Sequence, residues 1–348
     1  MKFPPLPPED LDHVLQHTGK LWEELRGQRL FITGGTGFFG MWLLESFARA
    51  NDVLNLGASA VILTRDPAAF AAKAPHLARR PDLGFLEGDI RTFPFPAGRF
   101  PFVIHAAAEA SAKMNAENPG EMRDVIVAGT CRVLDFAVRA GVRKLLFTSS
   151  GAVYGRQPSE LTHTPEDYSG TADPLWTDSA YGAGKRVAEQ MCTEHARQYG
   201  FDVKTARCFA FVGPHLPLDA HFAIGNFIRD ALAGGAIRVT GDGTPRRSYL
   251  YAADLAIWLW TILLNGVPGR AYNTGSPHGL SVGQIAAAVA AAVSGSKVER
   301  ARRSSMGMMH AHYVPDVRRA EAELGLRVCI PLSEAINKTI KWHRAAHY

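Results

Sequence analysis

The glycine-rich stretch "TGGTGFFG", Thr33 to Gly40, is the feature that most constrains the fold of this chain. It follows the apolar run "RLFI" and precedes "MWLLESFARA", whose apolar residues have helical spacing. Glycines spaced as GxxGxxG between a strand and a helix permit a tight turn, and they let a pyrophosphate approach the helix N-terminus. A glycine loop can also be a purely structural turn, so its context decides. We expect dinucleotide contacts from Gly34, Thr36, Gly37, Phe38, Phe39 and Gly40.

The context is an alternation of short apolar or β-branched runs with helical patterns. The runs are "RLFITGG", "SAVILTRD", "LGFLEGDI", "PFVIHAAA", "RKLLFTSS" and "DVKTARCFAFVG". Parallel strands need long crossovers and become buried on both faces, which produces this alternation. The sequence therefore predicts an α/β fold with a Rossmann-type, doubly wound parallel sheet.

The remaining segments predict how the chain is divided. Residues 1–28 form a proline-rich lead and an amphipathic helix, which we interpret as an N-terminal helical extension. Residues 29–213 form the dinucleotide-binding domain. Residues 214–348, where the strand rhythm loosens, form a smaller C-terminal substrate-binding lobe, with some of the chain returning to the large sheet.

Composition narrows the class of protein. The 348 residues are 47% apolar and 20% charged, as is common in a globular enzyme. No apolar segment approaches the ~20 residues that span a bilayer, and the N-terminus lacks a signal-peptide core, so we expect a cytoplasmic protein without a membrane partner. The net charge of +5 is scattered, which favours a small anionic substrate over nucleic acid.

The four cysteines are widely separated along the sequence. Cys131, Cys192, Cys208 and Cys329 form no CxxC pair and no cluster with histidines at metal-ligand spacing. We interpret them as reduced, mostly buried thiols, and the sequence predicts no metal site.

The ends of later strands suggest where the rest of the dinucleotide lies. In "VILTRDP" an acid, Asp66, favours NAD by binding the ribose 2′-hydroxyl, whereas Arg65 can pair with the 2′-phosphate of NADP or lie on the surface. Asp89 and Ile90 in "EGDIR" are placed for the edge and face of adenine. The small side chains of residues 106–108 leave room for a nucleotide, although tight helix packing needs the same residues. These are Ala106, Ala107 and Ala108.

The segment "SAYGAGKRVAEQ" places Tyr181 and Lys185 four residues apart, on one face of an expected helix. An ammonium beside a phenol lowers the pKa of the phenol and makes it usable as an acid or base near neutral pH. An exposed helical pair would have the same spacing.

Together with "TGGTGFFG", "GDI", "HAAA" and "TSSGAVYG", this order of motifs resembles the extended short-chain dehydrogenase/reductase superfamily, in particular the nucleotide-sugar epimerase/dehydratase branch. The resemblance runs from about Arg29 to Gly325. It implies that Tyr181 transfers a proton, that Lys185 holds the nicotinamide ribose, and that Ser150 hydrogen-bonds the sugar oxygen being oxidised. It also implies a bound NAD or NADP and a nucleotide-diphosphate sugar as substrate.

Later motifs extend the resemblance into the C-terminal lobe. "ARCFAFVGP" and "YVPDVRRAEAELG" resemble the family's sixth strand and closing motif, and "GDGTPRRSYLYAADLA" implies a phosphate contact from Arg247. Arg247 could instead belong to a surface ion pair, and Asp254 could be a helix N-cap. In "LDAHFAIGN" the candidates for sugar contacts are His221, Phe222 and Asn226. The resemblance further implies a homodimer, through the helices after Pro119 and around Tyr181.

The chain departs from the family where dehydratases carry an acid pair. Gly151 and Ala152 stand there, and neither moves a proton. This favours 4-epimerisation, or net oxidation or reduction at one carbon, over 4,6-dehydration, which stays an alternative because Glu109 could supply an acid. Ile126 and Ala210 also stand where the family has asparagines. A non-catalytic dinucleotide-binding regulator is the alternative of another class, and the intact serine, tyrosine and lysine count against it.

Overall fold

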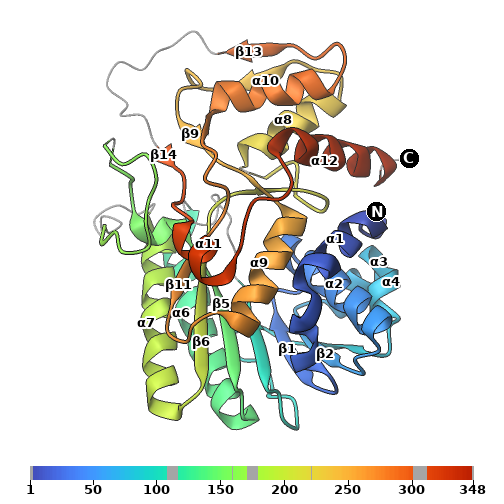
Figure 1. Cartoon of the computed structure of the whole chain (residues 1–348), viewed down its shortest axis with the longest axis vertical. Helices are drawn as coiled ribbons and strands as arrows, with labels where there is room; N and C mark the ends of the chain where they lie inside the picture. The colour runs from blue at the N-terminus through green and yellow to red at the C-terminus, as the bar shows by residue number, and fades with distance from the viewer. Residues whose placement is uncertain are drawn as a thin grey trace.

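The computed structural model describes residues 3–107, 117–158, 160–170, 179–220, 222–300 and 312–346. Its centre is a seven-stranded sheet in the order β11-β6-β5-β4-β1-β2-β3, and every neighbouring pair in it is parallel. The predicted doubly wound sheet is confirmed (Figure 1). The strands are β1 (Arg29–Thr33), β2 (Ser59–Thr64), β3 (Leu83–Glu87), β4 (Phe102–His105), β5 (Lys144–Ser150), β6 (Asp202–Cys208) and β11 (Ala271–Thr274).

Helices cover both faces of the sheet because its strands are apolar on both sides. Along β1, Leu30 and Ile32 join the core cluster that contains α2 (Phe38–Leu54) and α9 (Ala252–Asn265). Phe31, between them, faces the opposite way and joins the cluster under two other helices. Those helices are α6 (Pro119–Ala140) and α7 (Ala180–Tyr199).

The N-terminal extension packs on the outside of α2 and α9. It forms α1 (Pro8–Thr18) and the 3₁₀ helix η1 (Gly19–Leu25). Trp22 is fully buried, and its ring lies 4.7 Å from that of Trp260 in α9. The short helices α3 (Pro67–Lys73) and α4 (Pro75–Ala78) follow β2.

The chain reverses its direction of winding between β4 and β1. From β1 it runs outward through β2 to β3, and from β4 it runs the other way through β5 and β6. In open parallel sheets, ligands bind beyond the carboxyl ends of the strands at such a switch point. The loops after β1 and β4 therefore mark the edge on which a site is expected.

A second lobe lies over this edge (Figure 1). Part of the C-terminal chain returns to the large sheet as β11 and α9, and α11 (Arg318–Leu324) lies against β11. The domain boundaries at 28 and 213 stay predictions. The smaller strands are β7 (Phe211–Val212), β8 (Ile237–Val239), β9 (Arg246–Arg247), β10 (Leu250–Tyr251), β12 (Leu280–Ser281), β13 (Val298–Arg300) and β14 (His312–Tyr313). The helices of the lobe are α8 (Ala223–Leu232), α10 (Val282–Ala292) and α12 (Leu332–Ala346).

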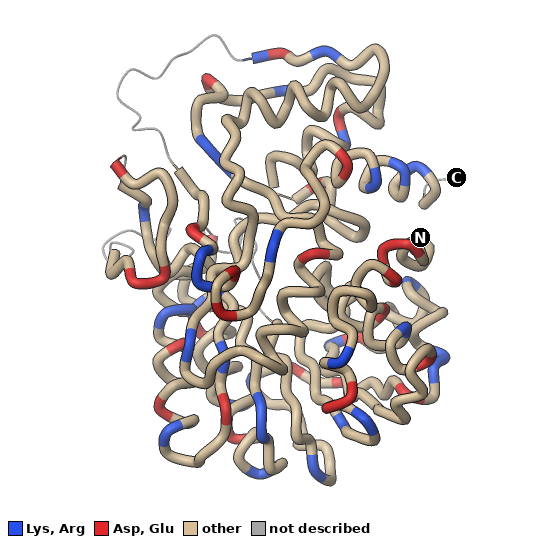
Figure 2. The backbone as a smooth tube through the Cα atoms, viewed as in Figure 1, with Lys and Arg blue, Asp and Glu red and all other residues tan. Residues whose placement is uncertain are grey.

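Charged residues of both signs are interspersed along the two lobes (Figure 2). In the described part of the chain, no helix combines the length and apolarity that crossing a bilayer requires.

Candidate active site

Ser150 is the last residue of β5, at the carboxyl edge of the sheet. Its side chain is buried, and its Oγ accepts a hydrogen bond from the backbone N–H of Ala152 at 3.2 Å. Ser150 thereby caps the 3₁₀ helix η2 (Gly151–Tyr154). The end of β5 thus places the Ser150 hydroxyl at the carboxyl edge of the sheet, and the cap of η2 fixes its direction.

Tyr181 and Lys185 lie on the first turns of α7, which packs against β5 and η2. The Tyr181 side chain forms a hydrogen bond with the Ser150 hydroxyl. Lys185 is fully buried, and its Nζ donates to the backbone carbonyl oxygen of Thr148 at 2.8 Å. The three residues named from the sequence are therefore brought together at one edge.

Burial dominates the electrostatics of the tyrosine. Burial raises the pKa of Tyr181 well above its ordinary value, and the hydrogen bond from Ser150 opposes this shift only in part. The Nζ of Lys185 lies 6.0 Å from the centroid of the Tyr181 ring, too far to offset the burial. The role of Lys185 in lowering the pKa of Tyr181 therefore stays a prediction. Burial also lowers the pKa of Lys185, to about 8.

Tyr313, in β14, is a member of the site that the sequence analysis missed. Its hydroxyl oxygen lies 3.5 Å from Ser150 Oγ. A β-carbon built on Gly151 would lie 2.8 Å from that hydroxyl and 2.9 Å from the ring of Phe209. Phe209 and Tyr313 pack together, with ring centroids 4.7 Å apart. The second tyrosine therefore fills the space that a side chain at 151 would need.

Backbone pairing holds Tyr313 in place. In β14 it is the register partner of Arg247 in β9. The next residue, Val314, donates its N–H to Gln157 Oε1 at 3.2 Å and accepts from the N–H of Thr164 at 2.9 Å. The Arg247 guanidinium lies 5.9 Å from the Tyr313 ring centroid, so the arginine predicted to meet the diphosphate lies beside the site. Its phosphate contact stays a prediction.

A network of polar contacts supports the turn after Ser150. Arg207, in β6, donates to the Tyr154 hydroxyl at 2.9 Å and forms an ion pair with Glu189 of α7 at 2.7 Å. The Tyr154 hydroxyl in turn donates to Asn273 Oδ1 at 2.7 Å. Because Tyr154 ends η2, this network connects the turn after Ser150 to β6, β11 and α7.

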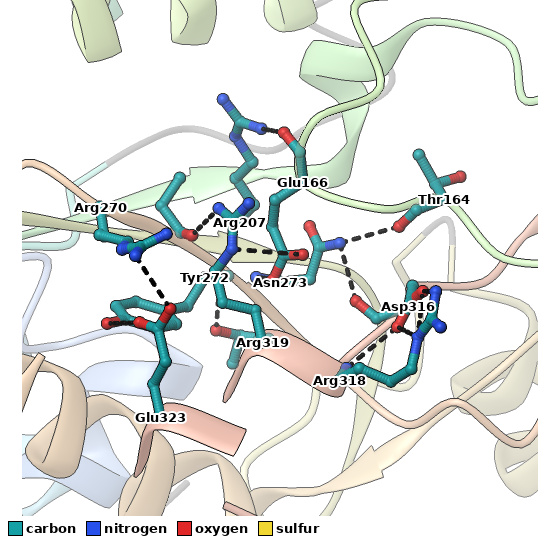
Figure 3. A network of polar contacts seen from close by, with 12 residues as sticks. Thr164, Glu166, Arg207, Arg270, Tyr272, Asn273, Asp316, Arg318, Arg319 and Glu323 are labelled. Atoms are coloured by element: carbon teal, nitrogen blue, oxygen red, sulfur yellow. Dashed lines mark hydrogen bonds and ion pairs between the residues drawn. The ribbon is translucent and has the colours of Figure 1, made fainter. Parts of the chain in front are cut away.

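The same network reaches the segment that carries Tyr313 (Figure 3). Asn273 Nδ2 donates to the backbone oxygens of Thr164 at 2.8 Å and Asp316 at 2.9 Å. The backbone N–H of Asn273 donates to Glu166 Oε1 at 2.9 Å. One buried asparagine therefore positions both the turn after Ser150 and the chain just beyond Tyr313.

The glycine loop after β1 has the shape that a pyrophosphate requires. Gly34 has a φ of +74°, and a β-carbon there would lie 2.5 Å from the carbonyl carbon of Ala106. The helix α2 begins after Gly37 with no side chain capping its N-terminus. The loop and the dipole of this helix therefore fit an anionic group at the switch point.

Comparison with known proteins shows the family to which the chain belongs. Residues 30–275 match the family described as "NAD dependent epimerase/dehydratase family". The chain belongs to this family. It is 34% identical over 242 residues to UDP-glucuronic acid decarboxylase 1 of Xenopus tropicalis, which covers 70% of this chain and 56% of that protein. UDP-glucuronic acid decarboxylase 5 of Arabidopsis thaliana is 32% identical over 235 residues, 67% of each protein. The chain thus matches little more than half the length of the Xenopus relative.

Solved structures of similar fold include two kinds of enzyme. The dTDP-glucose 4,6-dehydratase DesIV of Streptomyces venezuelae, with bound NAD, superposes with a TM-score of 0.74 at 25% identity, over 91% of this chain and 97% of that one. UDP-glucose 4-epimerase of Thermotoga maritima has a TM-score of 0.75 at 21% identity, over 92% and 100%, and this likeness shows the fold alone.

The acidic side chains expected around the adenosine form hydrogen bonds with other residues of the protein. Asp66 Oδ1 caps α3 by accepting the N–H of Ala69 at 2.8 Å. Arg65 is exposed and favours the charged form of Asp89. Both Asp89 carboxylate oxygens bond Arg91, which holds the pKa of Asp89 at about 2. These contacts do not distinguish NAD from NADP.

Several other predicted contacts have packing roles in the structure. A β-carbon on Gly40 would lie 2.2 Å from the carbonyl carbon of Gly35, so the loop needs this glycine for its own close packing. Ile90 packs against Gly129 of α6. Phe39 packs on Phe211, with ring centroids 5.1 Å apart.

Only some of the remaining candidate site residues lie in the described part of the chain. Phe222 is the residue before α8, and Asn226 Oδ1, one turn into that helix, accepts from Arg229 at 3.2 Å. Ala107 donates its N–H to Thr33 Oγ1 at 3.1 Å. Ile126, at a position where the family has an asparagine, packs on Gly184 of α7. Ala108, Glu109 and His221 lie outside the described residues.

Proposed function

We propose that this chain is an NAD-dependent enzyme that modifies the sugar of a nucleotide-diphosphate sugar by hydride transfer at one carbon, in the first instance a 4-epimerase. The family membership supports the class of enzyme, as does the assembly of Ser150, Tyr181 and Lys185 at the edge of the sheet that also carries the glycine loop. The glycine at 151 and the phenol that fills its place support the type of reaction.

The chemistry divides between cofactor and protein. A bound nicotinamide would accept a hydride from the sugar carbon and return it to the other face. The protein must orient the sugar hydroxyl, remove its proton and give one back. Ser150 orients the sugar oxygen, and Tyr181, bonded to Ser150, receives and returns the proton. Lys185 is the cation that favours the Tyr181 phenolate when the two groups approach.

The site around Gly151 argues against elimination of water. A 4,6-dehydratase must remove the proton at C5 and protonate the leaving hydroxyl at C6. Neither Gly151 nor Ala152 carries a titratable group, and the adjacent Tyr313 phenol has a pKa raised to about 12 by burial. Such a phenol keeps its proton near neutral pH, so it is a hydrogen-bond donor rather than a base. The 4,6-dehydratase reaction therefore stands as the less favoured alternative.

UDP-glucuronic acid decarboxylation is a second candidate, favoured by the relatives at 34% and 32% identity. Oxidation at C4 of a glucuronic acid makes a β-keto acid, which loses CO₂ without a metal or an acid pair. The guanidinium of Arg247, beside Tyr313, is the group that could neutralise the sugar carboxylate. Incubation with UDP-glucuronic acid distinguishes the candidates: release of CO₂ supports the decarboxylase, and an unchanged carbon count supports the epimerase.

We propose NAD rather than NADP as the cofactor. The solved DesIV structure holds NAD, and Asp66 stands at the end of β2 where an acid favours the ribose 2′-hydroxyl. Denaturing the purified protein and measuring the mass of the released dinucleotide tests this. NAD would support the proposal, and NADP would contradict it.

We also propose a homodimer formed through α6 and α7, which lie side by side on the outside of the sheet (Figure 1). Three large apolar side chains on these helices are exposed: Val138 (37%), Val187 (45%) and Tyr199 (49%). Val187→Asp should halve the mass measured by light scattering, whereas Val267→Asp, exposed elsewhere, should not. A wild-type monomer would contradict the dimer. The cytoplasmic location stays a prediction.

A further inference from the structure

Two histidines and a cysteine from opposite ends of the chain meet on the surface. His13 and His17 lie one turn apart on α1, and Cys329 lies between α11 and α12. Each offers one ligand atom, a ring nitrogen or the Sγ, and these atoms all lie within 4.8 Å of one another. His13 is half-buried, and the other two side chains are exposed. The proposed function uses none of them. The expectation of mostly buried cysteines holds for Cys192 and Cys208 and is wrong for Cys131 and Cys329.

The hydrogen bonds of the two histidines leave a lone pair on each ring. His17 Nδ1 lies 2.9 Å from the backbone carbonyl oxygen of His13, which can only accept, so Nδ1 carries the proton and Nε2 the lone pair. His13 Nε2 lies 3.2 Å from Asp254 Oδ1, so its Nδ1 is left with the lone pair. In its neutral form, each ring is thereby fixed in a tautomer that can bind a metal.

Asp254 organises this corner of the molecule. Its side chain is fully buried at the start of α9, and besides His13 it accepts the backbone N–H groups of Cys329 at 2.9 Å and Ile330 at 3.0 Å. The possible role of Asp254 as an N-cap gives way to this one. A carboxylate that holds the far nitrogen of a histidine is the arrangement that orients histidine ligands in metal sites.

We propose that His13, His17 and Cys329 form a site for a transition metal of the Zn²⁺ class, with Asp254 orienting His13. Two imidazoles and a thiolate are the nitrogen and sulfur ligands that this class prefers. The side chains need to close by about 1 Å, since tetrahedral ligands at ~2.0–2.3 Å from zinc stand roughly 3.5 Å apart. With three protein ligands, the fourth position is left to water or an exchangeable ligand.

A metal at this site would link two segments that are far apart in the sequence. α1 belongs to the N-terminal extension and packs on α9, while Cys329 follows the helix that lies against β11. A metal held by both would join the extension to the C-terminal segment, and it would stabilise the folded chain according to its affinity. The sequence predicts no metal site because the ligands are far apart along it.

Zinc binding by the full chain tests the proposal. Equilibrium dialysis after EDTA treatment should show one tightly bound Zn²⁺ per chain and a raised melting temperature. His17→Ala and Cys329→Ser should each weaken binding by at least a hundredfold. The matched controls are His195→Ala, whose Nδ1 makes the same bond to a carbonyl one turn back, and Cys131→Ser, another exposed thiol. Both controls should bind zinc like the wild type.

The absorption spectrum of bound Co²⁺ distinguishes this site from a site formed by the two surface histidines alone. Co²⁺ bound to the wild type should show a thiolate-to-metal absorption band that Cys329→Ser abolishes, while melts in EDTA confirm that each variant is folded. Wild-type zinc affinity in Cys329→Ser would overturn the proposal, because the metal would then need only the histidines. Equal loss in the two control variants, or no bound zinc in the wild type, would also overturn it.

Discussion

The hydroxyl oxygen of Tyr313 lies 2.8 Å from the place that a β-carbon on Gly151 would occupy. A separation under 3 Å is shorter than real β-carbon contacts, and the ring of Phe209 closes the same space at 2.9 Å. Glycine at 151 and tyrosine at 313 are therefore a matched pair. The acid expected of dehydratases is absent at this position, and a phenol from the second lobe fills the space that its side chain would need.

Gly151→Ala should lower kcat/KM at least tenfold and destabilise the protein by about 1–3 kcal/mol, because the added methyl group forces Tyr313 or Phe209 to move. Gly120→Ala is the control, since a β-carbon there meets nothing within 4 Å. Adding Tyr313→Phe to Gly151→Ala should recover part of the loss. Additive effects of the two changes in thermal melts and kinetics would refute the pairing.

Tyr181→Phe should lower kcat by about 10²–10⁴-fold, the usual contribution of a general acid or base, without changing the melting temperature by more than a few degrees. Tyr199→Phe, an exposed tyrosine at the other end of α7, should leave kcat unchanged. Turnover by Tyr181→Phe at the wild-type rate would contradict the role of Tyr181 in proton transfer, and a wild type without turnover on any nucleotide sugar would favour the non-catalytic regulator.

Lys185→Met should abolish turnover and yet stabilise the cofactor-free protein near neutral pH. The pKa of Lys185 falls from 10.5 to about 8 on burial, so below pH 8 the folded chain bears the cost of a buried charge. Between about pH 8 and 10.5 the unfolded chain holds a proton that the folded chain lacks. The contribution of Lys185 to the unfolding free energy therefore rises there, by up to about 1.4 kcal/mol per pH unit.

The measurement for this prediction is the difference in unfolding free energy between wild type and Lys185→Met as a function of pH. The advantage of the variant should shrink as pH rises through that window. A difference independent of pH would mean that burial does not shift the pKa of Lys185.

Arg207→Met should destabilise the protein by about 3–5 kcal/mol, because it leaves Glu189, whose side chain is only 12% exposed, without its partner. Arg207→Lys should not rescue it, since lysine cannot reproduce the bonds from Nε and Nη2 to one carboxylate. Arg318→Ala is the control: its side chain is 85% exposed, so the loss should stay below about 1 kcal/mol in urea unfolding. Similar losses of unfolding free energy in Arg207→Met and Arg318→Ala would contradict a stabilising role of the buried network.

The sequence predicts what local patterns encode. The glycine loop, the buried parallel strands and the 181/185 pair each lie within a short window, so periodicity and spacing suffice to find them. The role of Ser150 is implied by the resemblance of "TSSGAVYG" to the family's motif, which also lies within a short window.

Contacts between distant segments could not be predicted in this way. Tyr313 reaches Ser150 only because β14 pairs with β9, and Asn273 joins three segments through its side-chain amide. The pKa of Tyr181 depends on how deeply it is buried and on where the Lys185 ammonium points, which spacing along a helix does not determine. These features require the packed structure.

The most direct test of the central claim is the reaction in ²H₂O, with the mass and proton spectrum of the product recorded for a panel of nucleotide hexoses and UDP-glucuronic acid. Hydride transfer at one carbon predicts an intact carbon skeleton, inverted at C4, with no solvent deuterium on any carbon. A product that has lost water or CO₂ and carries deuterium from the solvent would contradict it.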